Sequence, residues 1–310
     1  MLFVIGLELQ PSRLWVLRKQ VFGLGSSQVL LTGLVLGTIG YMLGLPVNAA
    51  LIVGIGLALS STAFVLQMHA EQKQLTTVHG RAAFSLLLLQ DLAVIPLLAL
   101  VPFLGVIEAA TAQDSAWMRV LQIVSALVAI VVGGRYLLRP VFRALARWGS
   151  EDTFTAAALL IVVGAALLMN WVELSMGLGA FLAGLLVADS EYRHQLEADI
   201  TPFKGLLIGL FFIAVGMSVD VGLLISQLGT VIQLTLGLLL IKGIILFGLG
   251  HAFSLSNTPA RNLAFTICQG GEFAFVLFGV AVGSQIIDQT LADLLIVVVT
   301  LSMGLTPFLF

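Results

Sequence analysis

The chain has 310 residues, of which 59% are hydrophobic and 10% are charged, with a formal net charge of -2. Soluble domains contain about 25% charged residues, so this composition excludes a largely water-exposed surface and indicates lipid as the surrounding solvent. The weak net charge and the lack of a basic run argue against nucleic acid as a partner. The single cysteine, Cys268, excludes an internal disulfide and a cysteine-based metal cluster, and we expect it to be a small buried residue.

Apolar stretches of membrane-spanning length recur along the whole chain. A helix needs about 20 mostly apolar residues to cross a bilayer, and open strands cannot span lipid because their edges stay unpaired. We therefore expect an all-α polytopic membrane protein with eleven spans. The expected spans are 1–16, 28–44, 49–68, 83–106, 117–139, 153–172, 175–189, 205–219, 228–250, 261–283 and 291–310.

The loops between these spans alternate in charge. One set contains Arg13, Arg18, Lys19, Lys73, Arg81, Arg139, Arg143, Arg147, Arg193, Lys204 and Arg261, and the other contains Arg119 with Glu108, Asp114, Glu173, Asp220 and Asp288. Positive residues collect on the cytoplasmic side of a membrane. We therefore expect the first set of loops and the C-terminus to be cytoplasmic.

Short sequence matches at a nearly constant separation predict an internal repeat. Residues 3–8 resemble 213–218, residues 63–66 resemble 274–277, and Pro96 corresponds to Pro307. An odd number of spans separates the two copies, so the second copy should be inverted in the membrane. Inverted repeats with broken helices are a common plan of secondary transporters. The alternative is a chance similarity between apolar segments.

We single out three charged residues in the interior of apolar spans: Asp91, Lys242 and Glu272. A charge at the bilayer centre costs about 2.5–3.5 kcal/mol on insertion scales. A structural ion pair, or snorkelling of Lys242, is the alternative to a functional role, but the aspartate side chain is too short to snorkel. A carboxylate suits cation–proton exchange because the same oxygen can hold a proton or a small cation, but not both. We expect Asp91 to be the ion-binding proton carrier beside the carbonyl of Gln90, Lys242 to pair with Asp91, and Glu272 to be a supporting charge.

Two segments at matching repeat positions are poor helix formers. They are Ser60, Ser61 and Thr62 in the first copy and Gly270, Gly271 and Glu272 in the second. Hydroxyl side chains compete for backbone hydrogen bonds, and glycine disfavours the helix. We expect both segments to unwind at mid-membrane and to direct Ser61, Thr62, Gly270 and Gly271 towards a central cation. Close helix packing through small residues is the alternative.

The four histidines fall in expected loops or at the ends of expected spans. They are His69, His79, His194 and His251. Their spacing does not predict a metal site, and we expect them to be solvated or interfacial. One of them is a candidate pH sensor, because histidine titrates near neutral pH.

These residues give the chain a resemblance to a known family. The matching stretches are 3–9, 58–63, 80–96, 194–220 and 269–273. With them the chain resembles the Kef-type branch of the monovalent cation:proton antiporter-2 family, which has the sodium/hydrogen exchanger fold.

The resemblance implies a thirteen-helix fold with two crossed, unwound helices, of which about eleven helices are present. It implies a core bundle formed by 28–106 and 228–310, a linker helix at 117–139, and a dimer-forming part formed by 1–16 and 153–219. The abrupt apolar start at Met1 and the end at Phe310 suggest that two upstream helices and the cytosolic nucleotide-binding domain usual in Kef proteins are missing.

The resemblance also implies roles for individual residues. Asp91 matches the family's ion-binding aspartate, and Lys242 matches the membrane lysine of the second repeat. The Gln90–Asp91 pair resembles the potassium-handling branch more than the sodium exchangers. A homodimer in a bacterial inner membrane is implied, with no cofactor beyond the transported ions.

We therefore expect an antiporter that exchanges potassium or sodium for protons by competition at Asp91 with alternating access. Two alternatives remain open, a gated potassium efflux channel and a non-transporting truncated fragment. An intramembrane aspartyl protease would need two membrane aspartates that share a proton, and Asp91 is the one aspartate deep within an apolar span. We therefore do not expect an enzyme.

Overall fold

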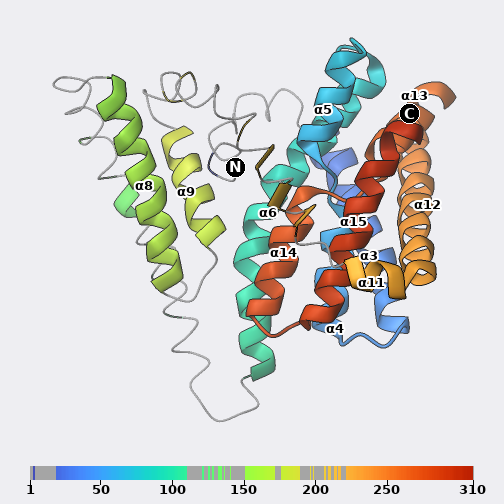
Figure 1. Cartoon of the computed structure of the whole chain (residues 1–310). Coiled ribbons are helices and arrows are strands. Elements are labelled where there is room, and N and C mark those ends of the chain that lie inside the picture. The colour runs from blue at the N-terminus through green and yellow to red at the C-terminus, as the bar shows by residue number, and fades with distance from the viewer. Residues whose placement is uncertain are drawn as a thin grey trace. The chain divides into compact units, whose positions relative to one another are not determined.

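The computed structural model describes residues 19–109, 151–171, 176–188 and 221–309, together with single residues between these ranges. Every element in these ranges is a helix (Figure 1). The helices are η1 (Lys19–Gly25, a π-helix), α3 (Ser26–Met42), α4 (Val47–Ala58), α5 (Thr62–Glu71), α6 (Val78–Ala109), α8 (Glu151–Trp171), α9 (Met176–Ala188), α11 (Val221–Ser226), α12 (Leu228–Ala252), α13 (Asn257–Ile267), α14 (Glu272–Gly283) and α15 (Gln289–Leu309). The predicted all-α fold is confirmed for the described part of the chain.

Five stretches among the described residues are long and apolar enough to cross a membrane, or six when α13 and α14 are counted as one bent span. The five are Val21–Met42, Val47–Glu71, Val78–Pro102, Leu228–Ala252 and Gln289–Leu309. The expected spans at 153–172 and 175–189 correspond to α8 and α9. The expected spans at 1–16, 117–139 and 205–219 lie outside the described residues, apart from scattered positions.

The chain divides into two compact units. Met1–Pro11 and Leu98–Met217 form one unit, and Ser12–Leu97 and Ser218–Phe310 form the other. In the first unit, α8 and α9 pack closely, because a side chain at Gly179 would strike the backbone of Ala165 and Ala166. The second unit contains all three charged residues that were singled out in the sequence. The predicted division into core, linker and dimer-forming parts stays a prediction.

The second unit is built from two similar four-helix halves, α3 to α6 and α12 to α15. The turn after the first helix has the same backbone hydrogen bond in each half: Leu45 N–H donates to Gly40 O at 3.1 Å, and Leu255 N–H donates to Gly250 O at 2.8 Å. The residue before each donor is left-handed, with φ of 100° at Gly44 and 64° at Ser254. The repeat suggested by short sequence matches is therefore present in the backbone itself.

Both predicted helix breaks are present. Helix α4 ends at Ala58 and α5 begins at Thr62, while α13 ends at Ile267 and α14 begins at Glu272. The second break bends the chain by 44°. The two breaks touch, because a Cβ at Gly271 would lie 2.5 Å from the carbonyl carbon of Ser60. A glycine at that position allows the two backbones to cross in direct contact.

Helices α3 and α4 also meet backbone to backbone. A Cβ at Gly54 would lie 2.6 Å from the amide nitrogen of Gly37 and closer still to the carbonyl oxygen of Gly33. Small residues permit such close approach between membrane helices, where packing and not water exclusion holds helices together. The first half of the broken helix is thus fixed against its neighbour in sequence.

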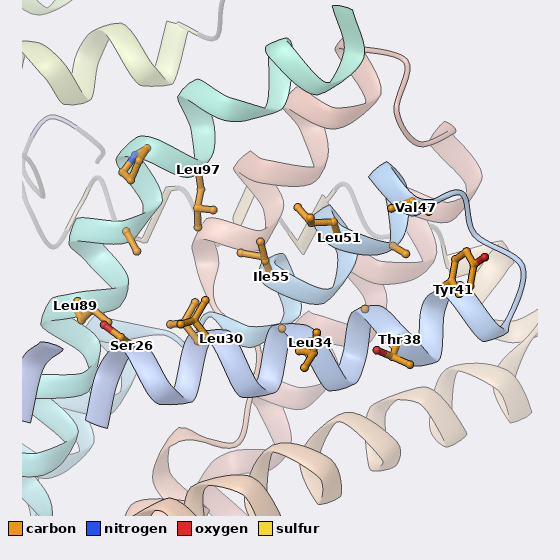
Figure 2. Close-up of a pocket in the computed structure, with 16 residues that line it drawn as sticks. Ser26, Leu30, Leu34, Thr38, Tyr41, Val47, Leu51, Ile55, Leu89 and Leu97 are labelled. Carbon is orange, nitrogen blue, oxygen red and sulfur yellow. The ribbon is translucent and has the colours of Figure 1, made fainter. Parts of the chain in front are cut away.

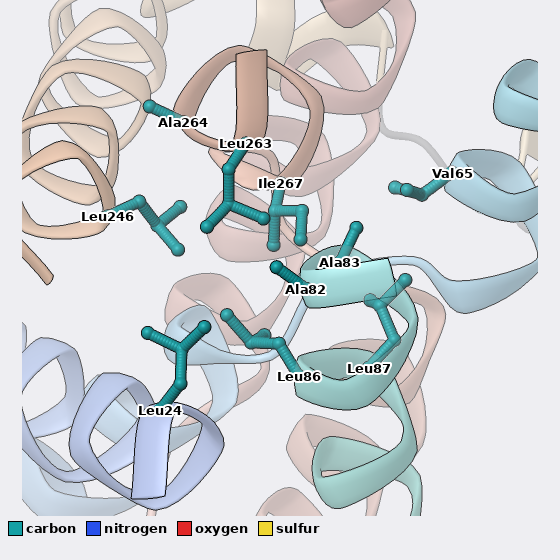
Figure 3. Close-up of a cluster of buried hydrophobic side chains, with 10 residues drawn as sticks. All are labelled: Leu24, Val65, Ala82, Ala83, Leu86, Leu87, Leu246, Leu263, Ala264 and Ile267. Atoms are coloured by element: carbon teal, nitrogen blue, oxygen red, sulfur yellow. The ribbon is translucent and has the colours of Figure 1, made fainter. Parts of the chain in front are cut away.

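Apolar packing joins the two repeats on one side of the breaks. Figure 3 shows a cluster to which Leu24, Val65, Ala82, Ala83, Leu86, Leu87, Leu246, Leu263, Ala264 and Ile267 contribute. These residues come from η1, α5, α6, α12 and α13. Side chains of both repeats therefore form one apolar cluster beside the breaks.

A separate apolar cavity of about 680 Å³ lies between α3, α4 and α6. In Figure 2, Leu30, Leu34, Leu51 and Ile55 are among the side chains that line it. Its polar lining side chains are Ser26, Thr38 and Tyr41. The cavity is thus distinct from the charged residues at the breaks.

Candidate functional site

Lys242 is fully buried in the middle of α12. Its Nζ donates to the carbonyl oxygens of Leu57 at 3.0 Å, Leu59 at 2.9 Å and Gln269 at 2.6 Å, and to the hydroxyl of Ser60 at 3.0 Å. These carbonyls belong to the C-terminal ends of α4 and α13, or follow them directly. Helix C-termini have unpaired carbonyls and a partial negative charge. One lysine therefore satisfies the C-terminal ends of two broken helices.

The predicted ion pair between Lys242 and Asp91 is wrong. The lysine has four oxygen acceptors, and none of them belongs to a carboxylate. The physical reason is the pair of breaks, which expose backbone carbonyls where no water can pair with them. The ammonium satisfies these carbonyls instead of neutralising the aspartate.

Glu272 lies at the N-terminal ends of the helices that follow the breaks, whereas Lys242 contacts the C-terminal ends of the helices that precede them. It is the first residue of α14 and only 2% exposed. Its carboxyl group lies near the hydroxyl of Ser61 and the backbone amides of Thr62 and Ala63, at the start of α5, while its Oε2 has no hydrogen-bond partner among the described protein atoms. Helix N-termini have free amides and a partial positive charge, so an anion is favourable there. The two buried charges thus each match the helix ends that they contact.

Asp91 lies on α6 and faces the start of α5. Its Oδ1 accepts a hydrogen bond of 2.7 Å from the hydroxyl of Thr62, the first residue of that helix. Asp91 is 9% exposed, compared with 2% for Glu272 and 0% for Lys242. Of these three membrane charges it is therefore the most accessible.

Gln90 belongs to a network of amides that joins three helices. Its Oε1 accepts from the backbone N–H of Ser60 at 2.8 Å, and its Nε2 donates to Oε1 of Gln28 at 2.7 Å. Nε2 of Gln28 donates to the carbonyl of Ala58 at 3.0 Å. The carbonyl of Gln90 that we expected beside the cation is thus engaged at the break, and its role as an ion ligand stays a prediction.

Gln28 was missed in the sequence because a glutamine near the end of an expected span is usually interfacial. It is instead fully buried. A signal was present in its spacing from Thr32, because residues four apart lie on the same helix face. The 3.3 Å hydrogen bond between these two side chains lies on that buried polar face.

The two glycines of the second break hold its backbone against neighbouring segments. Gly270 N–H donates to the hydroxyl of Ser302 on α15 at 2.9 Å, and Gly271 makes the close approach to Ser60 described above. The hydroxyl of Ser60 donates in turn to the carbonyl of Ile267 at 2.8 Å. Ser61 and Thr62 lie at the start of α5, beside Glu272 and Asp91 respectively. The predicted site residues therefore meet around one crossing, although their contact with a cation stays a prediction.

The expectation that all the histidines are solvated or interfacial is wrong for two of them. His69 is fully buried and His79 is 8% exposed, because the turn between α5 and α6 folds both rings inwards. His251 is exposed as expected, and His194 lies outside the described residues. Within the described ranges, no group of three metal-ligating side chains occurs.

Two broken helices in contact, with buried ionisable side chains at their ends and an aspartate beside them, are typical of secondary transporters. The family described as "Sodium/hydrogen exchanger, transmembrane" matches residues 1–310. The chain therefore belongs to the sodium/hydrogen exchanger family, whose members are transporters and not enzymes. It is an integral membrane protein, and its family supports cation:proton antiport.

Proposed function

We propose that the chain exchanges a monovalent cation for protons and that Asp91 is the shared carrier. The observation that supports this role is the position of its carboxylate, beside the start of half-helix α5 and more accessible than the other two membrane charges. A proton and a cation compete for the same oxygens, so each must leave before the other binds. Competition at one group couples the two fluxes.

The position of Lys242 simplifies this mechanism. Because its ammonium is bound to backbone carbonyls, a cation that reaches Asp91 does not have to displace the lysine. Lys242 and Glu272 then act as fixed charges that hold the crossing together. Thr62, which donates to Asp91, supplies a hydroxyl oxygen next to the carboxylate as a further ligand.

We propose potassium as the preferred cation, with sodium as the alternative, and a Kef-type place within the family. This choice is supported by the resemblance of the Gln90–Asp91 pair to the potassium-handling branch. The ligands themselves are hard oxygens, which suit either alkali cation.

Transport by purified protein in liposomes tests exchange directly. With a pH-sensitive dye inside the vesicles, an outward potassium gradient should drive proton uptake, and sodium should drive less. The proton movement should persist when the membrane potential is clamped, because the two fluxes are coupled at one carboxyl. Potassium flux without proton movement would instead indicate a channel.

We also propose a cytoplasmic C-terminus, supported by the alternation of basic and acidic loops, and a homodimer in a bacterial inner membrane, supported by the resemblance to the Kef-type branch. Lys73 is exposed in the turn between α5 and α6, a turn assigned to the cytoplasm by this alternation. In a Cys268→Ser background, a cysteine at position 73 should react with an impermeant thiol reagent in inside-out vesicles and not in whole cells. Labelling in whole cells would refute the orientation, and a monomer mass in detergent would refute the dimer.

A further inference from the structure

Two histidine rings meet inside the turn that connects α5 to α6. Their centroids are 5.4 Å apart, and both side chains are buried, at 0% exposed for His69 and 8% for His79. The side chain of Gln74 lies beside the rings, with its Oε1 2.9 Å from Nε2 of His79. The hydroxyl of Thr77 lies 3.3 Å from Nδ1 of His79. The rings therefore form a compact polar cluster, separate from Asp91.

The second repeat contains the same turn without this cluster. Gln74 N–H donates to His69 O at 2.7 Å, and at the equivalent place Ile286 N–H donates to Ala281 O at 2.9 Å. The residue before each donor is left-handed, with φ of 57° and 58°. The cap that starts the next helix is also shared, because Gly80 N–H donates to the Thr77 hydroxyl in one repeat and Leu291 N–H to the Asp288 carboxylate in the other.

The side chains that fill the two turns differ in kind. The second repeat buries Ala281 together with Ile286 and Ile287, each of the latter 6% exposed. An apolar filling is thus sufficient for this backbone in this protein. The imidazoles and the amide of the first repeat are not needed to form the turn, so their chemistry requires another explanation.

The cluster is connected to the ion site through one short helix. His69 lies in the last turn of α5, and Thr62, which donates to Asp91, is the first residue of the same helix. His69 is seven steps along the α-helix from Thr62, a distance of about 10 Å along a rigid element. A displacement at the histidine end of α5 is therefore transmitted to the hydroxyl that contacts Asp91.

We propose that His69 and His79 form a second proton-binding site, distinct from Asp91, that controls exchange by moving α5. A proton on His79 can be held by donation to Oε1 of Gln74, but protonation of both rings places two like charges 5.4 Å apart in a buried pocket. Acidification on the side of this turn should therefore loosen the C-terminal end of α5. Exchange should fall as Thr62 is withdrawn from Asp91.

The charged side chains on the helices around the histidine cluster do not share its buried pocket. The charged residues of the same segment and of the packed helices α12 and α13 are Glu71, Lys73, Arg81, Lys242, His251 and Arg261. Lys242 is bound to the backbone carbonyls at the breaks, and the other five are exposed. Exposed charges interact weakly across water and salt. His79, with its ring centroid 5.4 Å from that of His69, is therefore the buried titratable group in contact with it.

The test uses the second repeat as a template. The double variant His69→Ala/Gln74→Ile gives the first turn the apolar filling of the second, and His79→Gln keeps a hydrogen-bonding side chain that does not titrate. The control is His251→Ala, which removes an exposed histidine. Thermal stability of the purified protein, measured between about pH 7.5 and about pH 5.5 where imidazoles titrate, needs no transport.

The wild type and the control should lose stability on acidification, because the buried pair is forced to charge. The double variant and His79→Gln should lose distinctly less. The same pH dependence in all four proteins would overturn the second site.

The effect of this site on exchange is measured separately in liposomes. This part of the proposal rests on the proposed function. Acid on the side of the turn should reduce exchange severalfold in the wild type and much less in the double variant. Equal inhibition of both would overturn control by this pair. If no protein exchanges ions, the proposed function fails, while the stability data still decide whether the site exists.

Discussion

Asp91→Asn should reduce cation-driven proton movement to the level of empty vesicles while the protein still folds. Asparagine keeps an Oδ1 that can accept the 2.7 Å hydrogen bond from Thr62. It cannot take up a proton in the working range or present a negative charge to a cation. Dye-based exchange in liposomes measures the loss, and thermal unfolding of the same preparation verifies the fold.

Asp293→Asn is the matched control for this substitution. Asp293 lies on α15, where its carboxylate accepts from Nε2 of Gln289 at 2.7 Å in an exposed position. Its replacement should leave exchange unchanged. Exchange at the wild-type rate in Asp91→Asn would remove Asp91 as the carrier.

Lys242→Met should destabilise the crossing strongly and should not primarily shift the pH profile of exchange. Methionine has a similar length, but it leaves the carbonyls of Leu57, Leu59 and Gln269 without their donor. Each buried acceptor left without a partner costs about 1–3 kcal/mol. Removal of the buried ammonium also removes its desolvation cost, which offsets part of this loss of stability. We expect a net loss of about 3 kcal/mol, the lower end of the range for breaking a buried polar cluster, measured as unfolding in detergent.

The matched control is Lys73→Asn, because Lys73 is exposed and left-handed with φ of 57°, and asparagine tolerates that conformation. It should unfold like the wild type. A Lys242→Met protein of normal stability, with its pH profile of exchange moved to higher pH, would contradict the role of Lys242 as the donor to these carbonyls. It would instead support the ion pair between Lys242 and Asp91.

The sequence predicted the parts of the fold that hydropathy and helix propensity control. The expected span at 28–44 is α3 at Ser26–Met42, and the one at 228–250 is α12 at Leu228–Ala252. Both breaks were predicted because serine, threonine and glycine weaken a helix where they cluster. The expected start of α6 at residue 83 was late, since its first turn at Val78 begins outside the strongly apolar stretch.

The contacts at the site could not be predicted in the same way. The acceptors of Lys242 are mainly backbone carbonyls, which every residue has, so no residue type marks them. Pairing by opposite charge therefore favoured Asp91 incorrectly. The burial of His69 depends on how the turn folds back, and a Cβ at Gly80 would collide with the carbonyl of Gln74. Such long-range packing leaves no local pattern in the sequence.

The contact between α3 and α4 limits how this unit can deform. No side chain lies between Gly54 and the backbone of Gly33 and Gly37, so nothing there can change rotamer to absorb a displacement. Sliding one helix past the other would force backbone atoms through each other's van der Waals surfaces, and close-packed interiors resist such strain. We therefore expect α3 and α4 to move together as one rigid pair. A displacement of α5 relative to this pair would therefore have to occur at residues 59–61, where the backbone is held by the side chains of Lys242 and Gln90.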